Sequence, residues 1–416
     1  MTTNGTLLTE DNAGDTVASI AQAQAISADE IALYDRQIRL WGVQAQEKIR
    51  SANVLLVSIR ALANEIAKNL VLAGIHSITL VDHEAVTQDD LGSQFLVSEA
   101  DVGRNRAEAA AIQIRKLNPR VTVNTITDNI LLQGPELYGP FDVIVATNQD
   151  YQTLSTINAS TRLASRPFYA AGMHGFYGYI FADLIQHEYV IEREKGNRDT
   201  VLGPESATRS VLAATTKTEN GKVVEMVTKR ELYSPLLLAN TSPLPIDIVA
   251  SPRKLGQVTP LLTCFRALWD FETGTQRLPT YSHVDLQLFT TLATEKHKEL
   301  QLPTEMLRSE FLRSFLQNLG SELAPVSAFL GGQVAQDVIN VLGKREQPLQ
   351  NFSLFDGEES KGPIYALHPI FTADIDPTAI SIPAAPVTDV QTPEVPISAM
   401  QNQNAPTLSG SSLGIA

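Results

Sequence analysis

The sequence VLLVSIRALANEIAKNL at residues 54–70 decides the fold, because it predicts a strand, a tight turn and a helix in direct succession. The strand is the apolar run at 54–57, and a helical pattern of apolar residues is established by 65–70. A buried strand that turns directly into a helix is typical of α/β domains with a parallel sheet.

The turn of this unit, SIRALA at residues 58–63, lies where nucleotide-binding α/β domains carry the motif G-x-G-x-x-G. Those glycines let the backbone turn tightly, approach phosphates and pack the helix against the strand. Ser58, Arg60 and Ala63 occupy the three glycine positions here, and Arg60 places a long side chain where phosphates would lie. We therefore predict the frame of a nucleotide site without the glycine backbone that contacts phosphates.

Composition limits the class of protein. The chain has 416 residues, 43% of them hydrophobic, which is enough for a substantial buried core. Its net charge of −14 argues against nucleic acid or an anionic membrane as the main partner. The single cysteine, Cys264, excludes a disulfide framework and a multi-cysteine zinc site, and the histidines show no metal-ligand spacing. No apolar run reaches the about 20 residues that a membrane span needs, and the N-terminus lacks signal-peptide features.

Strands and helices alternate outward from the first unit, up to residue 170. The predicted elements are strands at 53–58, 77–82, 121–126, 142–146 and 167–170 and helices at 61–73, 105–117 and 152–164. Such alternation predicts a parallel sheet covered by helices on both faces. The alternating pattern at 177–190 suggests an antiparallel extension, and 193–255 reads as strands and loops. Before the first unit, Ser27 and Glu30 form a capping-box pattern that opens a helix.

Short segments along the chain, in this order and spacing, resemble the adenylation domain of enzymes that activate ubiquitin-like proteins and of their bacterial MoeB/ThiF relatives. They are YDRQIRLWG at 34–42, the turn at 58–63, VD at 81–82, QFL at 94–96, DVGRNRAE at 101–108, AG at 171–172 with Gly175 and Gly178, APV at 324–326 with GG at 331–332, and FDG at 355–357. Within the family, RLWG and GRNRAE resemble the smaller, non-catalytic subunit of heterodimeric SUMO-activating enzymes.

This resemblance implies a Rossmann-like, adenylation-type α/β fold with a mainly parallel sheet, an antiparallel extension and a helical insertion. The expected segments are a disordered tail at 1–26, a pseudo-adenylation domain at 27–192, an insertion of strands, loops and helices at 193–320, a return to the adenylation-type domain at 321–371, and a disordered tail at 372–416.

The family chemistry is acyl adenylation, in which the C-terminal carboxylate of the modifier attacks the α-phosphate of ATP. A cysteine of the catalytic subunit then takes the acyl group as a thioester. Such a site needs glycine backbone and cations at the phosphates, and acids for ribose and magnesium.

Residue by residue, the resemblance implies that this chain's own pocket is degenerate. Asp82 and Glu84 keep the acidic positions after the second strand, but Ser93 replaces a phosphate-facing arginine. Arg106 replaces a lysine, which keeps the charge and changes its shape. Asn148 replaces the magnesium-binding aspartate. Together with the lost glycines, these changes predict that the chain alone holds neither nucleotide nor metal, and that ATP and magnesium bind at a partner's site.

Arg36 is the one candidate catalytic residue. The resemblance implies that it reaches across a dimer to ATP phosphates in the partner's pocket, as an arginine finger does. Judged on the sequence alone, Arg36 is a solvated helix arginine, and Arg39 either shares its role or pairs with an acid. Our hypothesis is that this chain completes a partner's active site without owning one.

The partners implied are the catalytic subunit of the SUMO-activating enzyme, SUMO and, indirectly, the conjugating enzyme, with no nucleic acid or membrane. The implied location is the nucleus, with the cytoplasm as a second location. One alternative is the Nedd/Rub-type regulatory subunit, which carries a longer helical insertion than 193–318 allows. A second alternative is a dinucleotide-dependent oxidoreductase, but Arg60 argues against it. A third alternative is a scaffold in which Arg36 has no role.

Overall fold

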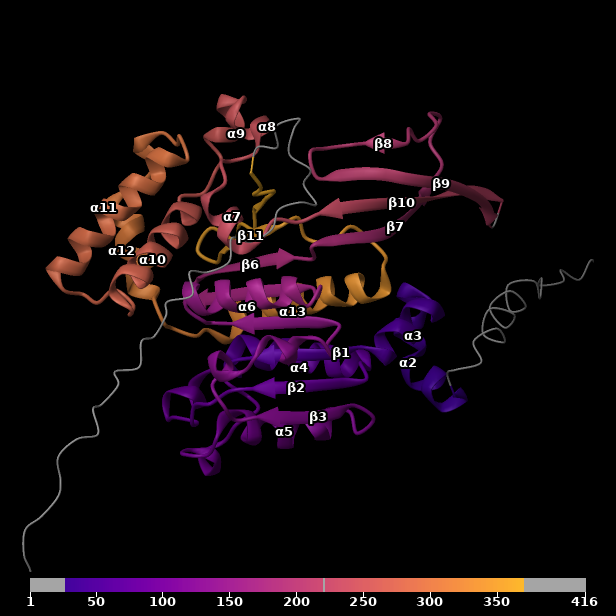
Figure 1. Ribbon diagram of the computed structural model, residues 1–416, viewed down its shortest axis with the longest axis horizontal. Helices are drawn as coiled ribbons and strands as arrows, with labels where there is room; N and C mark the ends of the chain where they lie inside the picture. Colours follow the sequence, from indigo (N-terminus) through magenta and orange to yellow (C-terminus); the bar gives the residue numbers. More distant parts are fainter. Residues whose placement is uncertain (1–26, 220, 370–416) are drawn as a thin grey trace, which may run out of the picture. The chain divides into compact units, whose positions relative to one another are not determined.

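The structure, a computed structural model, describes residues 27–219 and 221–369 (Figure 1). The predicted tails at 1–26 and 372–416 lie outside these residues. The main sheet contains the parallel strands β1 (Asn53–Val57), β2 (Ser77–Val81), β3 (Thr122–Ile126), β4 (Val143–Thr147) and β5 (Phe168–His174). Its antiparallel strands are β6 (Tyr177–Asp183), β11 (Phe352–Asp356) and β12 (Ile364–Tyr365). The order is β12-β11-β6-β5-β4-β1-β2-β3, which confirms the predicted fold class.

The helices predicted at 61–73, 105–117 and 152–164 are confirmed as α4, α5 and α6. The α-helices are α2 (Ala28–Trp41), α3 (Val43–Ser51), α4 (Ala61–Ala73), α5 (Arg106–Leu117), α6 (Tyr151–Leu163), α7 (Leu236–Thr241), α8 (Ile246–Val249), α9 (Pro252–Leu255), α10 (Leu261–Thr275), α11 (His283–Glu299), α12 (Ser309–Asn318) and α13 (Ala324–Gly343). Short 3-10 helices are η1 (Asp89–Gly92), η2 (Glu99–Asp101), η3 (Ile130–Leu132), η4 (Pro135–Tyr138) and η5 (Thr304–Met306).

The capping box predicted at the start of α2 is present. The Ser27 hydroxyl accepts the Glu30 N–H at 3.3 Å, and the Glu30 carboxylate accepts the Ser27 N–H at 3.2 Å. Each contact satisfies a backbone donor that a helix start would leave unpaired, so this local sequence is sufficient to place the helix boundary.

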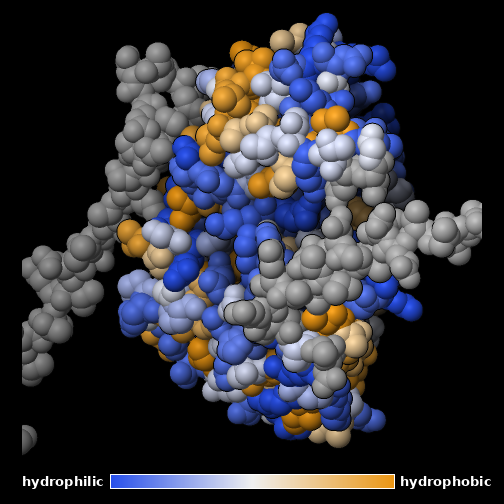
Figure 2. All heavy atoms as spheres, turned by 90° about the vertical axis from the view of Figure 1, so that its right-hand side faces the viewer, coloured by the Kyte–Doolittle hydropathy of each residue, from blue (hydrophilic) through white to orange (hydrophobic). Residues whose placement is uncertain are grey.

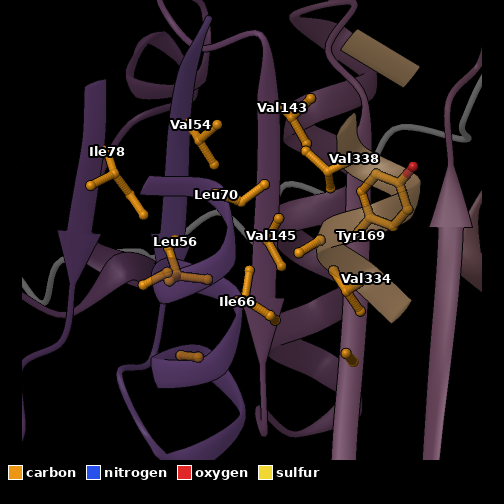
Figure 3. Packing of buried hydrophobic residues seen from close by; sticks show 14 of the residues in the cluster. Val54, Leu56, Ile66, Leu70, Ile78, Val143, Val145, Tyr169, Val334 and Val338 are labelled. Carbon is orange, nitrogen blue, oxygen red and sulfur yellow. The ribbon is translucent and has the colours of Figure 1, made fainter. Parts of the chain in front are cut away.

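The main sheet has an apolar core on each face because side chains alternate along each strand. On β1, Val54 and Leu56 point to the face covered by α4, α5 and α13. Figure 3 shows both on the same side of the sheet as Ile66 and Leu70 of α4 and Val334 and Val338 of α13. Leu55 and Val57 point to the opposite face and join the core formed with α6 and α10. This double burial explains why 54–57 is an uninterrupted apolar run.

A second, antiparallel sheet has the order β7-β10-β9-β8. Its strands are β7 (Gln186–Glu194), β8 (Gly203–Pro204), β9 (Arg209–Glu219) and β10 (Lys222–Leu232). The expectation of one extension over 177–190 is therefore only half right, because β6 joins the main sheet and β7 joins the second one. Ile185, at a positive φ of 61°, makes the turn between them, and its N–H donates to Asp183. The predicted boundary between the segments 27–192 and 193–320 falls inside β7. The segment boundaries therefore remain predictions.

The prediction of strands and loops throughout 193–255 is wrong for its last part. The short helices α7, α8 and α9 lie there; Pro235 and Pro245 are the N-cap residues of α7 and α8, and Pro252 is the first residue of α9. Proline fixes φ near its helical value and lacks the N–H that a first helical turn leaves unpaired, so it suits these starts.

Cys264 is buried within α10, and burial raises the pKa of its thiol. Among the helices of 27–219 and 221–369, none has the length and hydrophobicity to cross a bilayer.

The first turns of α4, which follow the turn at 58–63, pack closely against α13. A Cβ at Gly331 of α13 would lie 2.5 Å from the Cβ of Glu65 and 3.2 Å from the Leu62 carbonyl oxygen on α4. A Cβ at the neighbouring Gly332 would have nothing within 4 Å. Gly331 is therefore required by close helix packing, whereas Gly332 is not.

Gly331→Ala should lower the free energy of unfolding by about 1 to 3 kcal/mol, because the added methyl forces α4 and α13 apart. The matched variant Gly332→Ala should leave stability unchanged or raise it by up to about 1 kcal/mol, since alanine favours helix. Urea unfolding of the two variants measures this difference. Equal effects would contradict the close-packing explanation.

Candidate functional site

The candidate site lies at the carboxyl ends of β1, β2 and β4, the edge at which open α/β sheets bind ligands. A cleft of about 310 Å³ there is lined by Ser58, Asp82, Glu84 and Asn148, among others. A second hollow, of about 290 Å³, shares Asn148 and is lined also by Arg60. Five of the predicted pocket residues thus line two adjoining hollows, whereas Ala63, Ser93 and Arg106 line neither.

The backbone of the turn keeps the shape that glycine favours although glycine is absent. Ser58 has a φ of 66°, in the left-handed region, and its N–H donates to the Val81 carbonyl at 2.8 Å. The Thr147 hydroxyl donates to the Ser58 carbonyl at 2.8 Å. These contacts from β2 and β4 hold a conformation that is unfavourable for a serine. Ala63, at the third glycine position, is fully buried in the core.

Asp82 has both carboxylate oxygens occupied by contacts within the chain. Its Oδ2 accepts the Ile59 N–H of the turn at 2.7 Å and Arg106 Nη1 at 3.0 Å, and its Oδ1 accepts the Glu84 N–H at 2.9 Å. The side chain is only 3% exposed. These are the bonds of a strand-end acid that orders the turn, and they leave little capacity for a further ligand.

Arg106 lies at the centre of this acidic cluster. Besides Asp82, its guanidinium contacts Glu84 at 2.9 Å and Asp90 at 3.4 Å, and its side chain is 4% exposed. Burial by itself would lower the pKa of Arg106, but the carboxylates of Asp82, Glu84 and Asp90 outweigh it and raise that pKa. Arg106 thus neutralises buried acids of this chain.

Arg60, Ser93 and Asn148 converge on one carboxylate, that of Glu322. Arg60 Nε lies 3.2 Å from Glu322 Oε1 as an ion pair without hydrogen-bond geometry, and Asn148 Nδ2 donates to the same oxygen at 3.2 Å. Ser93 Oγ donates to Glu322 Oε2 at 2.8 Å. The other end of the Asn148 amide is used as well, because its Oδ1 accepts the Met173 N–H at 2.9 Å.

Sequence reasoning missed Glu322. It lies just before the segment at 324–326, and no local pattern marks it as a site residue. Its side chain is 8% exposed, and its partners come from three separate segments. Only the folded chain brings them together.

The second hollow also contains titratable groups with shifted pKa values. Burial, aided by the positive charge of Arg60, lowers the pKa of His174 to about 4, so the ring is neutral at pH 7. Burial raises the pKa of Glu272 to about 7; the Tyr151 N–H partly offsets this and the Asp150 charge adds to it. Within the described part of the chain, no group of three or more His, Cys, Asp or Glu is arranged to hold a metal ion.

Arg36 does not lie in this pocket. Its helix α2 contacts the C-terminal end of α4, where Gln37 Nε2 donates to the Leu72 carbonyl, whereas the pocket is at the N-terminal end. Thirteen residues of helix separate these ends by about 20 Å, and Figure 1 shows α2 beyond the amino ends of the parallel strands. Arg36 is exposed and makes no hydrogen bond or ion pair with residues 27–219 or 221–369, whereas Arg39 pairs with Asp35 at 3.0 Å.

Arg106→Leu should lower the free energy of unfolding by about 3 to 5 kcal/mol, because it leaves Asp82 and Asp90 buried without their cation. The neighbouring variant Arg104→Leu removes a pair whose arginine is 47% exposed, and it should cost less than about 1 kcal/mol. Chemical denaturation of both variants at pH 7 tests this. A loss at Arg106 no larger than that at Arg104 would show that the buried network contributes little.

Comparison with known proteins places these features in a family. Residues 34–369 match the sequence model of the ThiF family. The chain is 37% identical over 350 residues to the DNA damage tolerance protein RHC31 of Saccharomyces cerevisiae, covering 83% of this chain and 99% of that protein. It is 35% identical over 352 residues to SUMO-activating enzyme subunit 1 of Rattus norvegicus, covering 83% and 96% of the two chains. For SUMO-activating enzyme subunit 1 of Homo sapiens the identity is 34% over 352 residues, covering 83% and 97%.

Proposed function

Because the chain belongs to the ThiF family, we propose that it is the regulatory subunit of a SUMO-activating enzyme and acts with a catalytic partner subunit. Relatives that bear the name SUMO-activating enzyme subunit 1 align with it over nearly their whole length. The reaction is the ATP-dependent adenylation of the modifier's C-terminus, followed by thioester formation on the partner's cysteine.

In this proposal the chain's own pocket holds no Mg-ATP. Glu322 places a carboxylate beside Arg60 at the start of α4, and that carboxylate repels phosphates. At the position expected for a metal ligand, Asn148 uses its amide oxygen for the Met173 N–H and its amide nitrogen for Glu322. Magnesium prefers free oxygen ligands, so the residues present do not fit Mg-ATP. ATP and magnesium therefore belong to the partner's site.

One observation carries the proposed contribution to the partner's site: Arg36 is exposed and unpaired within residues 27–219 and 221–369, while Arg39 one turn later is paired. An unpaired guanidinium on a helix surface keeps all its donors for an external oxyanion. The exposed leucines Leu33 and Leu40 lie on the same helix as Arg36, 54% and 80% exposed.

Exposed apolar side chains next to an unpaired cation are typical of a protein–protein contact surface. Figure 2 shows this side of the molecule, on which α2 and α3 lie, with hydrophobic patches between hydrophilic ones. We therefore place the partner subunit against α2, with Arg36 directed at the phosphates of the partner's ATP.

Arg36→Ala should slow SUMO-dependent ATP–pyrophosphate exchange by the heterodimer about 10- to 1,000-fold, because a guanidinium that stabilises phosphate charge is removed. Arg39→Ala is the matched control on the same helix and should change the rate little, since Arg39 already pairs with Asp35. Size-exclusion chromatography should show an intact heterodimer for both variants.

Unchanged exchange in the Arg36→Ala heterodimer would refute the role in trans. Equal losses in both variants would indicate a general effect of α2 charge rather than one positioned guanidinium.

A further inference from the structure

The contacts around Glu322 exclude Mg-ATP in the proposed function, and they also form a site of their own. We propose that the Glu322 carboxylate is an intramolecular anion that fills an oxyanion site in the chain's own pocket, and that its removal lets a phosphate-class oxyanion bind at Arg60. This inference concerns the chain's own pocket and is independent of Arg36.

The position of the carboxylate is one that favours anions for two physical reasons. Arg60 is the N-cap residue of the 13-residue helix α4, and no side chain within the described residues caps that helix start. The N-terminus of a helix carries partial positive charge and unpaired N–H groups, and the adjacent guanidinium adds a full positive charge. An anion at this place is stabilised by both.

The backbone directly before Glu322 is also held in place. The Gly320 N–H donates to His174 Nδ1 at 3.1 Å, and the Ser321 carbonyl accepts the Gly175 N–H at 2.8 Å. These bonds fix the segment before Glu322 to the end of β5 and the turn that follows it. The carboxylate is therefore delivered to Arg60 by a segment with its own anchors, which limits how far it can move away.

The site would serve an oxyanion once Glu322 is gone, because its polar groups come from three segments and point to one place. Ser93 and Asn148 donate to the Glu322 carboxylate and Arg60 pairs with it by charge, and a phosphate oxygen could take the place of the carboxylate with all three. The Arg60 Nε makes no hydrogen bond among the described residues, so its donors are not exhausted. The adjoining hollow of about 290 Å³ gives a route of entry.

The test is binding of inorganic phosphate to the full-length chain by isothermal titration calorimetry at constant ionic strength. The wild-type chain should show no saturable binding. Glu322→Ala should bind phosphate with a dissociation constant at least about tenfold below the weakest value that the experiment can detect. The double variant Glu322→Ala/Arg60→Ala should lose this gain, because the guanidinium that receives the oxyanion is gone.

A matched control removes a different carboxylate from an arginine. Glu192→Ala removes the carboxylate that pairs with Arg345 at 2.8 Å and with Lys217 at 3.2 Å. The Arg345 side chain is 37% exposed, close to the 35% of Arg60. This variant should gain no phosphate binding, since Arg345 is not at the start of α4. Glu322→Ser also removes the carboxylate and empties the site, and it provides the test if Glu322→Ala does not fold.

No gain in a folded Glu322 variant, Ala or Ser, would overturn the proposal. A gain that persists in the double variant, or an equal gain in Glu192→Ala, would show non-specific binding to released positive charge and would overturn it as well.

Discussion

A buried carboxylate must have partners in the folded chain, and this constraint shapes the whole carboxyl edge of the parallel strands. Asp82 meets it through the Ile59 N–H and Arg106, which orders the turn between β1 and α4. Glu322 meets it through groups of Arg60, Ser93 and Asn148. In an open α/β site such polar groups face a ligand, whereas here they form hydrogen bonds and ion pairs with one another. The same contacts that stabilise the fold therefore occupy Asp82, Ser93 and Asn148, which lie at positions where the family binds a triphosphate.

This commitment explains how the chain can keep the architecture of a nucleotide-binding domain and still contribute at a different place. The parallel sheet and the α4–α13 packing keep α2 in position at the far end of α4, where Arg36 is free of partners among the described residues. In the proposed function, such a subunit offers a cation to its neighbour from a helix rather than from a loop. The placement of this cation matters because an arginine stabilises phosphate charge only at a suitable distance and orientation.

Features that depend on local sequence were predictable. The capping box of Ser27 and Glu30, the apolar run of β1 and the helix from Ala61 follow from short-range rules, and the structure confirms them. The short helices α7, α8 and α9 were not predictable in the same way, because the prolines at their starts are also typical of loops. Glu322 could not be predicted, because its role depends on contacts with residues 93, 148 and 60, far away in the sequence. Sequence could indicate which pocket groups had changed, but not which side chain had taken the place of a ligand.

The central claim is that this chain's own pocket cannot hold a triphosphate, so that nucleotide in the assembled enzyme belongs to the partner. Equilibrium dialysis of radiolabelled Mg-ATP against the isolated full-length chain, and then against the heterodimer, tests it most directly. We predict no saturable binding by the chain alone and one nucleotide per heterodimer. One tightly bound nucleotide per isolated chain would contradict the account.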